Sequence, residues 1–147
     1  MKIPETNTAV SKPVSKLTVG DSARMYRTVH EEDLIQFAEL SQDFNPVHLD
    51  EEYAKNTRFG GRIAHGLFCS AMVSALLGME LPGLGTIILS ESMRFLYPAY
   101  VGDTVEARVW VDSVRPEKNR ATIAFSCKNQ LDRILMEGSA EVTVENK

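Results

Sequence analysis

The stretch AHGLFCSAMVSALLGM, residues 64–79, decides the fold of this chain. It contains no proline and no Asp, Glu, Lys or Arg, and its apolar residues lie on nearly every side of a helix. A helix of this kind is buried on most of its faces, and this one is too short to cross a membrane comfortably. Leu81-Pro82-Gly83, which follows, is typical of a helix end. The sequence therefore predicts a long buried helix over residues 64–79.

A pattern with a period of two begins after Gly85. Apolar and polar residues alternate over four segments separated by turn residues, near positions 87–97, 105–111, 121–127 and 134–144. Gly138, inside the last segment, is a candidate β-bulge. Together with a weaker strand pattern at 22–28, these segments predict an antiparallel sheet of about five strands. One face of this sheet needs cover, and the helix at 64–79 is the element to provide it, which gives an α+β fold.

Two shorter helical patterns lie between the first strand and the long helix. Thr28 and Glu31 have capping-box spacing, and an apolar stripe follows them, so we expect a helix from about 29 to 41. Residues 50–56 predict one or two further helical turns, followed by a loop at 59–61. We expect residues 1–18, with two prolines and three lysines, to be a flexible lead-in, and residues 19–147 to form one domain.

The composition limits the class of protein. A chain of 147 residues with 44% apolar and 24% charged residues is typical of a globular domain with its own core. A net charge of -4 gives no concentrated basic surface for nucleic acid or a membrane. The N-terminal stretch resembles neither a secretory signal nor an organelle address. Cys69 and Cys127 lie in apolar settings, so we expect buried free thiols and a reducing, cytoplasmic compartment.

The stretch DFNPVH, residues 43–48, holds the first candidate site residues. Asp43 and His48 form a candidate general acid–base pair that holds one water, and Asn45 between them is placed to orient that water. The same residues also suit a simple surface turn, in which Asp43 and Asn45 bond to the backbone. A metal site is disfavoured because the histidines and cysteines lack metal-ligand spacing.

Further candidates flank the long helix. If that helix starts near Gly66, its first backbone N–H groups have no helical partners and are suited to stabilise a developing oxyanion. Ser70 and Ser74 share one helix face, and hydroxyls there often bond the carbonyl four residues back. Arg58 and Arg62 flank a glycine loop and are candidate phosphate contacts, although isolated arginines are more often solvated surface charges.

Three stretches together resemble the MaoC-like (R)-specific enoyl-CoA hydratases. They are FAELSQDFNPVHLD at 37–50, RIAHGL at 62–67 and YPAYVGDT at 97–104. The likeness extends over about residues 22–144 in the same order. Gln42 departs from the pattern, since many members have glycine before the aspartate, and this departure concerns the local turn geometry.

The resemblance implies a hot-dog fold, in which a sheet wraps a long helix, and a homodimer. It implies reversible addition of water to a trans-2-enoyl-CoA, giving an (R)-3-hydroxyacyl-CoA, as part of fatty acid metabolism and without a cofactor. By position, Asp43 and His48 are the catalytic pair, Asn45 and Ser74 support the site, and the Gly66 N–H is the oxyanion donor. The alternatives are a dehydratase acting on carrier-protein thioesters, a thioesterase, and a domain that only binds acyl thioesters.

Overall fold

The structure is a computed structural model that describes residues 10–145. All five strands belong to one antiparallel sheet in the order β1-β3-β4-β5-β2. The elements in chain order are η2 (Val14–Lys16), β1 (Ser22–Thr28), α1 (Glu31–Ser41), α2 (Pro46–Leu49), α3 (Glu51–Lys55), α4 (Leu67–Met79), β2 (Thr86–Phe95), β3 (Thr104–Arg115), η3 (Pro116–Lys118), β4 (Arg120–Lys128) and β5 (Ile134–Val144).

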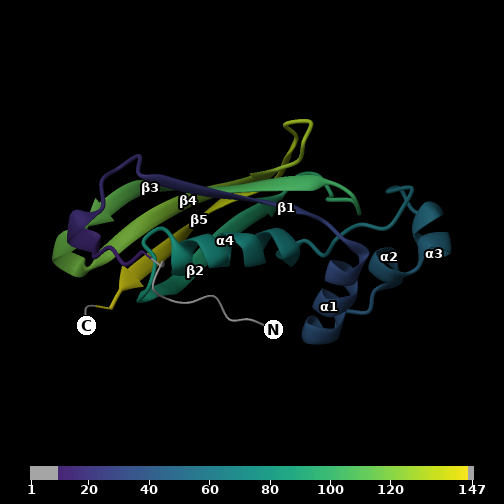
Figure 1. The fold of residues 1–147 in the computed structure, drawn as a ribbon, viewed down its shortest axis with the longest axis horizontal. Coiled ribbons are helices and arrows are strands. Elements are labelled where there is room, and N and C mark those ends of the chain that lie inside the picture. The colour runs from purple at the N-terminus through teal and green to yellow at the C-terminus, as the bar shows by residue number, and fades with distance from the viewer. Residues whose placement is uncertain (1–9, 146–147) are drawn as a thin grey trace.

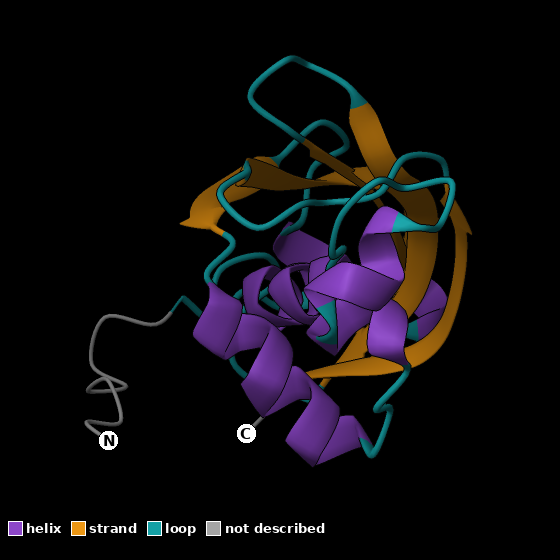
Figure 2. Cartoon of the chain, turned by 90° about the vertical axis from the view of Figure 1, so that its right-hand side faces the viewer, coloured by secondary structure: helices purple, strands orange, loops and turns teal. Residues whose placement is uncertain are grey.

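Helix α4 lies along the concave face of the sheet, and the three short helices gather beyond its N-terminal end (Figure 1). Seen from that end, the curved sheet partly surrounds α4 (Figure 2). The contact is apolar on both sides, because α4 buries a row of large side chains against the alternating inward residues of β3, β4 and β5. From α4 these are Phe68, Cys69, Met72, Val73, Leu76 and Leu77. This arrangement is a hot-dog fold, and the expectation for the fold class is confirmed.

Two elements are less covered than their patterns predict. Helix α4 is not buried on most sides, since Leu67, Ala71 and Ser74 are exposed along one face. Strand β2 buries none of its residues, although its alternation predicts one buried face. The reason is the sheet order, which leaves β2 at an edge with one strand neighbour, β5. An apolar edge strand and an apolar helix face therefore remain uncovered.

The expectation of a bulge at Gly138 is wrong. Gly138 pairs regularly with Met93 on one side and Phe125 on the other, and the register shifts lie elsewhere in the sheet. A β-carbon on Gly138 would lie 2.0 Å from the backbone oxygen of Ser92. The glycine is therefore required by the close approach of β2 to β5, which is the other common reason for glycine inside a strand.

Residues 10–18 pack against the rest of the domain. Residues 1–9 lie outside the described part of the chain, but Val14 and Leu17 are buried in the core. Val10 also forms backbone hydrogen bonds with Met79 and Leu84. The expectation of flexibility therefore does not hold for residues 10–18, because Val14 and Leu17 belong to the core and Val10 is hydrogen-bonded at the end of α4. No helix within residues 10–145 is long and apolar enough to span a membrane.

Candidate active site

The site begins where α1 ends. The last helical residue is Ser41, and Gln42 takes the left-handed conformation with φ 64°. This conformation suits glycine, and a residue with a β-carbon adopts it at a cost. The turn forms nevertheless, and the side-chain amide of Gln42 donates from Nε2 to the backbone carbonyl of Glu39 at 2.7 Å. The departure from the family pattern at position 42 thus leaves the turn geometry intact.

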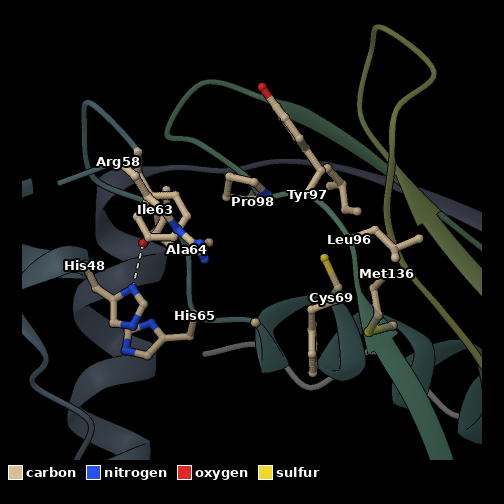
Figure 3. A pocket seen from close by; sticks show the side chains of 15 residues that line it. His48, Arg58, Ile63, Ala64, His65, Cys69, Leu96, Tyr97, Pro98 and Met136 are labelled. Atoms are coloured by element: carbon tan, nitrogen blue, oxygen red, sulfur yellow. Dashed lines mark hydrogen bonds between the residues drawn. The ribbon is translucent and has the colours of Figure 1, made fainter.

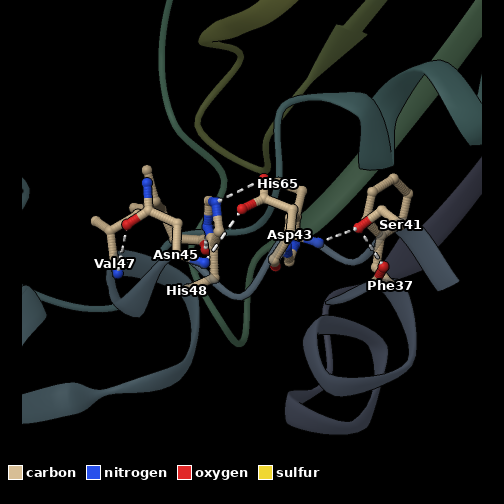
Figure 4. Close-up of polar contacts among 8 residues, drawn as sticks. Phe37, Ser41, Asp43, Asn45, Val47, His48 and His65 are labelled. Carbon is tan, nitrogen blue, oxygen red and sulfur yellow. Dashed lines mark hydrogen bonds and ion pairs between the residues drawn. The ribbon is translucent and has the colours of Figure 1, made fainter. Parts of the chain in front are cut away.

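The turn brings Asp43 opposite His48. Asp43 Oδ2 lies 3.8 Å from His48 Nε2, as the dashed contact in Figure 4 marks. This separation is too long for a direct hydrogen bond, but it leaves room for a water about 2.8 Å from each atom to bridge the two groups. The Asp43 side chain is about half exposed, whereas the His48 side chain is 10% exposed. One group of the pair thus faces solvent and the other faces the interior.

The orientation of His48 is set from a distant part of the chain. Its Nδ1 lies 2.8 Å from the carbonyl oxygen of Ile63. A carbonyl oxygen only accepts, so Nδ1 carries the hydrogen and Nε2 presents its lone pair toward Asp43. Burial lowers the pKa of His48 below its ordinary value, and the neighbouring His65 lowers it further, while the Ile63 carbonyl and Asp43 raise it. The ring is therefore a neutral base at pH 7.

His48 stands on a helix that the sequence reading missed. Residues 46–49 form the single turn α2, in a stretch for which the sequence predicted no helix. Asn45 is the N-cap, and its side-chain oxygen accepts from Val47 N at 3.3 Å. An amide cap followed by proline is a helix-start signal that could have revealed this turn. Asn45 thus contributes to the site by holding the helix that carries His48.

His48 and Gly66 line the same cavity of about 230 Å³. Its two histidines, His48 and His65, lie at one end, and Cys69, Leu96 and Met136 lie at the other (Figure 3). Asp43 does not line this cavity. Its carboxylate reaches toward His48 from the outside.

Gly66 is the N-cap of α4, so the helix begins at Leu67, three residues later than the pattern predicts. Within residues 10–145 its N–H has no backbone acceptor. A β-carbon here would lie 3.1 Å from the ring of Phe95, which also lines the cavity. Glycine thus leaves room for the aromatic ring and keeps an N–H at the cavity wall.

The three stretches that carry the family resemblance meet at this place. Ala64 N donates to the carbonyl of Ala99 at 2.8 Å, and Ile63 forms an isolated antiparallel bridge with Tyr100. Ile63 also contacts His48, as described above. The stretch at 62–67 therefore lies between the stretches at 43–48 and 97–104, and it joins them through its backbone.

The two serines of α4 differ from expectation. Ser70 donates to the thioether sulfur of Met93 at 3.0 Å and lies 3.6 Å from that of Met136, rather than bonding the carbonyl four residues back. Ser74 is exposed and lies eight residues, about 12 Å of helix rise, beyond Gly66. Within a single chain the structure does not bring Ser74 to the Asp43–His48 pair.

The arginines separate into two kinds. Arg62 donates to Glu31 at 2.9 Å and to Glu51 at 3.1 Å, so its charge is already neutralised. Burial opposes that charge, but these hydrogen bonds prevail and raise the pKa of Arg62. This pairing argues against the expected phosphate contact for Arg62. Arg58 lines the cavity, is exposed, and has no ion-pair partner among the described residues.

A further cation, which sequence reasoning missed, contacts a residue of the cavity wall. The guanidinium of Arg133, in the loop before β5, lies 4.7 Å from the centre of the Tyr97 ring. Tyr97 lines the cavity together with Arg58. No local motif marks Arg133, because Tyr97, which it contacts, is 36 positions away in the sequence.

Asp43, His48 and His65 are close enough to be considered as metal ligands, since one candidate ligand atom of each lies within 4.8 Å of the others. Their arrangement does not suit an ion. The two imidazole rings are stacked, with centres 3.8 Å apart and planes inclined by 27°. Imidazole lone pairs lie in the ring plane, so stacked rings do not direct them to a common point.

Fold and site together define a hot-dog domain with a carboxylate and an imidazole that face each other beside the start of its central helix. The chain belongs to the MaoC like domain family, whose model matches residues 15–131.

Named relatives are similar over most of their length. The chain is 42% identical to an (R)-specific enoyl-CoA hydratase of Rhodospirillum rubrum, over 85% of this chain and 86% of the relative. It is 40% identical to a 3-hydroxybutyryl-CoA dehydratase of Methylorubrum extorquens, over 89% of this chain and 83% of the relative. Among solved structures, R-hydratase PhaJ1 from Pseudomonas aeruginosa superposes with a TM-score of 0.87 at 39% identity, covering 93% of this chain and 88% of that one.

Proposed function

We propose that this protein is an (R)-specific enoyl-CoA hydratase, which reversibly adds water to a trans-2-enoyl-CoA to give an (R)-3-hydroxyacyl-CoA. The observation that carries the proposal is the 3.8 Å gap between Asp43 Oδ2 and His48 Nε2, next to a cavity that also contains Gly66. The relatives support the same chemistry, since they are named for hydration or for its reverse.

The tautomer of His48 suggests how the proton moves. Asp43 and His48 hold the water between them, and the bare Nε2 accepts a proton while the water oxygen bonds C3 of the enoyl group. The resulting imidazolium returns that proton to C2 on the same face. Asp43 holds the water and stabilises the transient positive charge on His48. One water is thereby added across the double bond, and both side chains regain their starting state.

Negative charge that develops on the thioester oxygen needs a donor. In this proposal the Gly66 N–H supplies it, with the N-terminal end of α4 behind it. The cavity is apolar beyond Gly66, at Cys69, Leu96 and Met136, and this end suits the acyl chain. The charged phosphates of CoA then lie toward the opposite, exposed rim, where Arg58 is the candidate contact, with Arg133 nearby.

We also propose a homodimer. The uncovered surfaces of β2 and α4 are both apolar, with Ile87, Leu89 and Phe95 exposed on β2 and Leu67 exposed on α4. Pairing of two β2 edges would satisfy the free backbone groups of the edge strand and cover these side chains. A contribution of Ser74 to the site then requires the partner subunit. Sedimentation equilibrium tests this proposal, and a stable active monomer refutes it.

The two buried thiols, Cys69 and Cys127, are free, in agreement with the sequence expectation. Unpaired cysteines fit a reducing compartment. We therefore propose a cytoplasmic enzyme of fatty acid metabolism.

The proposed activity is tested by the loss of enoyl absorbance with crotonyl-CoA. Asp43→Asn and His48→Ala are expected to lower kcat by about 10²–10⁴-fold, as for other acid–base groups. His30→Ala is the control for loss of an imidazole, because His30 is exposed and does not line the cavity; since His30 is also the N-cap of α1, the folded fraction of this variant is measured as well. Near-normal turnover in both site variants refutes the mechanism.

The same assay separates the alternatives. Faster turnover of the crotonyl carrier-protein thioester than of crotonyl-CoA indicates a carrier-protein enzyme. Release of free thiol indicates a thioesterase, and binding without turnover indicates a domain that only binds thioesters.

A further inference from the structure

His65 is a buried imidazole that the proposed reaction does not use. It is 4% exposed and belongs to the segment that leads into α4. Its ring lies between two others, with the centre of the Phe37 ring at 4.8 Å on α1 and the centre of the His48 ring at 3.8 Å on α2. The ring thus contacts two of the helices that form the outer wall of the site.

His65 also forms a hydrogen bond with the turn that carries Asp43. Its Nε2 lies 2.9 Å from the backbone oxygen of Asp43, across 22 positions of sequence (Figure 4). Because a carbonyl oxygen only accepts, Nε2 must carry the hydrogen. The turn is otherwise held by bonds within itself, from Asn45 N to Asp43 Oδ1 and from Asp43 N to Ser41 Oγ. The bond from His65 is the one that ties this turn to the start of α4.

The stacking completes the control of His48. The bond from His48 Nδ1 to Ile63 fixes the direction of one ring atom, and the stack on His65 fixes the plane of the ring. With both constraints present, Nε2 has one direction, toward Asp43. His65 therefore orients both groups. It forms a hydrogen bond with the backbone oxygen of Asp43, and its ring stacks on the ring of His48.

The remaining ring nitrogen indicates that His65 does not itself relay protons. Its Nδ1 is buried, and no hydrogen-bond partner for it exists among the described residues. With the hydrogen on Nε2, Nδ1 is a bare lone pair, whereas protonation would bury an unpaired N–H beside the His48 ring. The structure thus favours a fixed tautomer at His65 while His48 cycles.

We propose that His65 is a positioning residue for hydration, which holds Asp43 and His48 at their water-bridging separation without exchanging a proton with the substrate. This inference rests on the proposed function.

Two substitutions separate the two contacts. His65→Phe retains an aromatic ring for stacking and removes the donor to Asp43, whereas His65→Gln retains a donor and removes the ring. His30→Gln is the control. Kinetics with crotonyl-CoA and the titration of His48 by NMR are measured for all three variants and for the unsubstituted protein. Among the described residues, the charged and titratable groups that contact His48 or line its cavity are Asp43, Arg58, His65, Cys69 and Tyr97.

We expect kcat to fall by about 10- to 100-fold in the His65 variants, the size of effect that small misplacements cause, while KM changes by less than about threefold. Burial is the main cause that lowers the pKa of His48, and His65→Gln removes the ring that is stacked on it, so the titration of His48 is expected to move to higher pH in this variant and to stay in place in His30→Gln. A purely structural role would lower the folded fraction without this movement.

The inference is overturned if the His48 titration is unchanged in His65→Gln, or if kcat stays within about twofold of the unsubstituted protein. If His65→Phe does not fold, His65→Gln decides alone. An unsubstituted protein without hydratase activity refutes the proposed function, and the NMR titration then still decides whether His65 positions His48.

Discussion

Replacement of Asn45 by alanine removes the cap of the helix that carries His48. The α2 turn has only four residues, and its backbone bonds include His48 N to the Asn45 carbonyl at 3.0 Å and Asp50 N to the Pro46 carbonyl at 2.9 Å. The Asn45 side chain adds a bond to Val47 N at 3.3 Å. So short a helix has little stability of its own, and the loss of one bond matters more here than in a long helix.

The size of the effect follows from the cap. Substitution of a favoured N-cap residue by alanine typically costs about 1 kcal/mol, which multiplies the ratio of open to formed α2 by about five. Two hydrogen bonds with Ile63 remain. The N–H of Ile63 donates to the carbonyl of Val47, and His48 Nδ1 donates to the carbonyl of Ile63. We therefore expect kcat to fall by at most about fivefold, far less than the roughly 10²-fold or larger loss that follows removal of an acid–base group.

The assay compares Asn45→Ala with Asn45→Ser, since serine is as good a cap as asparagine and is also uncharged. We expect the serine variant to retain activity and to protect the amides of residues 46–49 from hydrogen exchange, and the alanine variant to lose part of both. If Asn45→Ser keeps its stability but loses activity as Asn45→Ala does, the reasoning is wrong, because the amide group then acts on the substrate or the water directly.

Three further predictions concern the same region. Because burial is the main cause that lowers the pKa of His48, kcat/KM should fall on the acid side at a pH below the ordinary value of 6.5. The unfolded chain binds a proton there that the folded chain does not, so the free energy of unfolding should also decrease below about pH 6.5, and His48→Gln should remove this part of the decrease in urea titrations. Gln42→Gly should raise the free energy of unfolding by about 0.5–1 kcal/mol, since it relieves a left-handed residue while adding freedom to the unfolded chain, and an unchanged or lower value contradicts the account. Arg58→Ala should raise KM for crotonyl-CoA, and the size of this effect should depend on salt concentration. Arg62→Ala should lower the melting temperature with little change in KM, because Arg62 forms ion pairs with Glu31 and Glu51. The opposite pattern would show that the two roles are reversed.

The sequence reading succeeded where local patterns carry the information. Alternation located all five strands, and the apolar run located α4 to within a few residues, because each pattern follows from the period of its own backbone. It was wrong about exposure on β2 and α4, since alternation states which residues share a face but not whether another element covers that face. It missed α2 because residues 43–48 were interpreted as a turn, whereas Pro46 is the first residue of a helix capped by Asn45.

At the site, the sequence by itself determined the candidate groups. Asp43 and His48 are five positions apart, and a turn between two helices suffices to make them face each other. The Gly66 N–H needed only the prediction that a helix begins there. These conclusions depend on neighbours in the chain, so a single sequence contains them.

Only the tertiary structure decided what each group is able to do. The tautomer of His48 depends on Ile63, the orientation of the pair depends on His65, and the neutralisation of Arg62 depends on Glu31, which is 31 positions away. Each of these contacts joins segments that are distant in the sequence and carry no local signal for one another. Their geometry arises only when the segment before α4 packs between α1, α2 and the loop after β2, and this packing turns a carboxylate and an imidazole into an oriented pair.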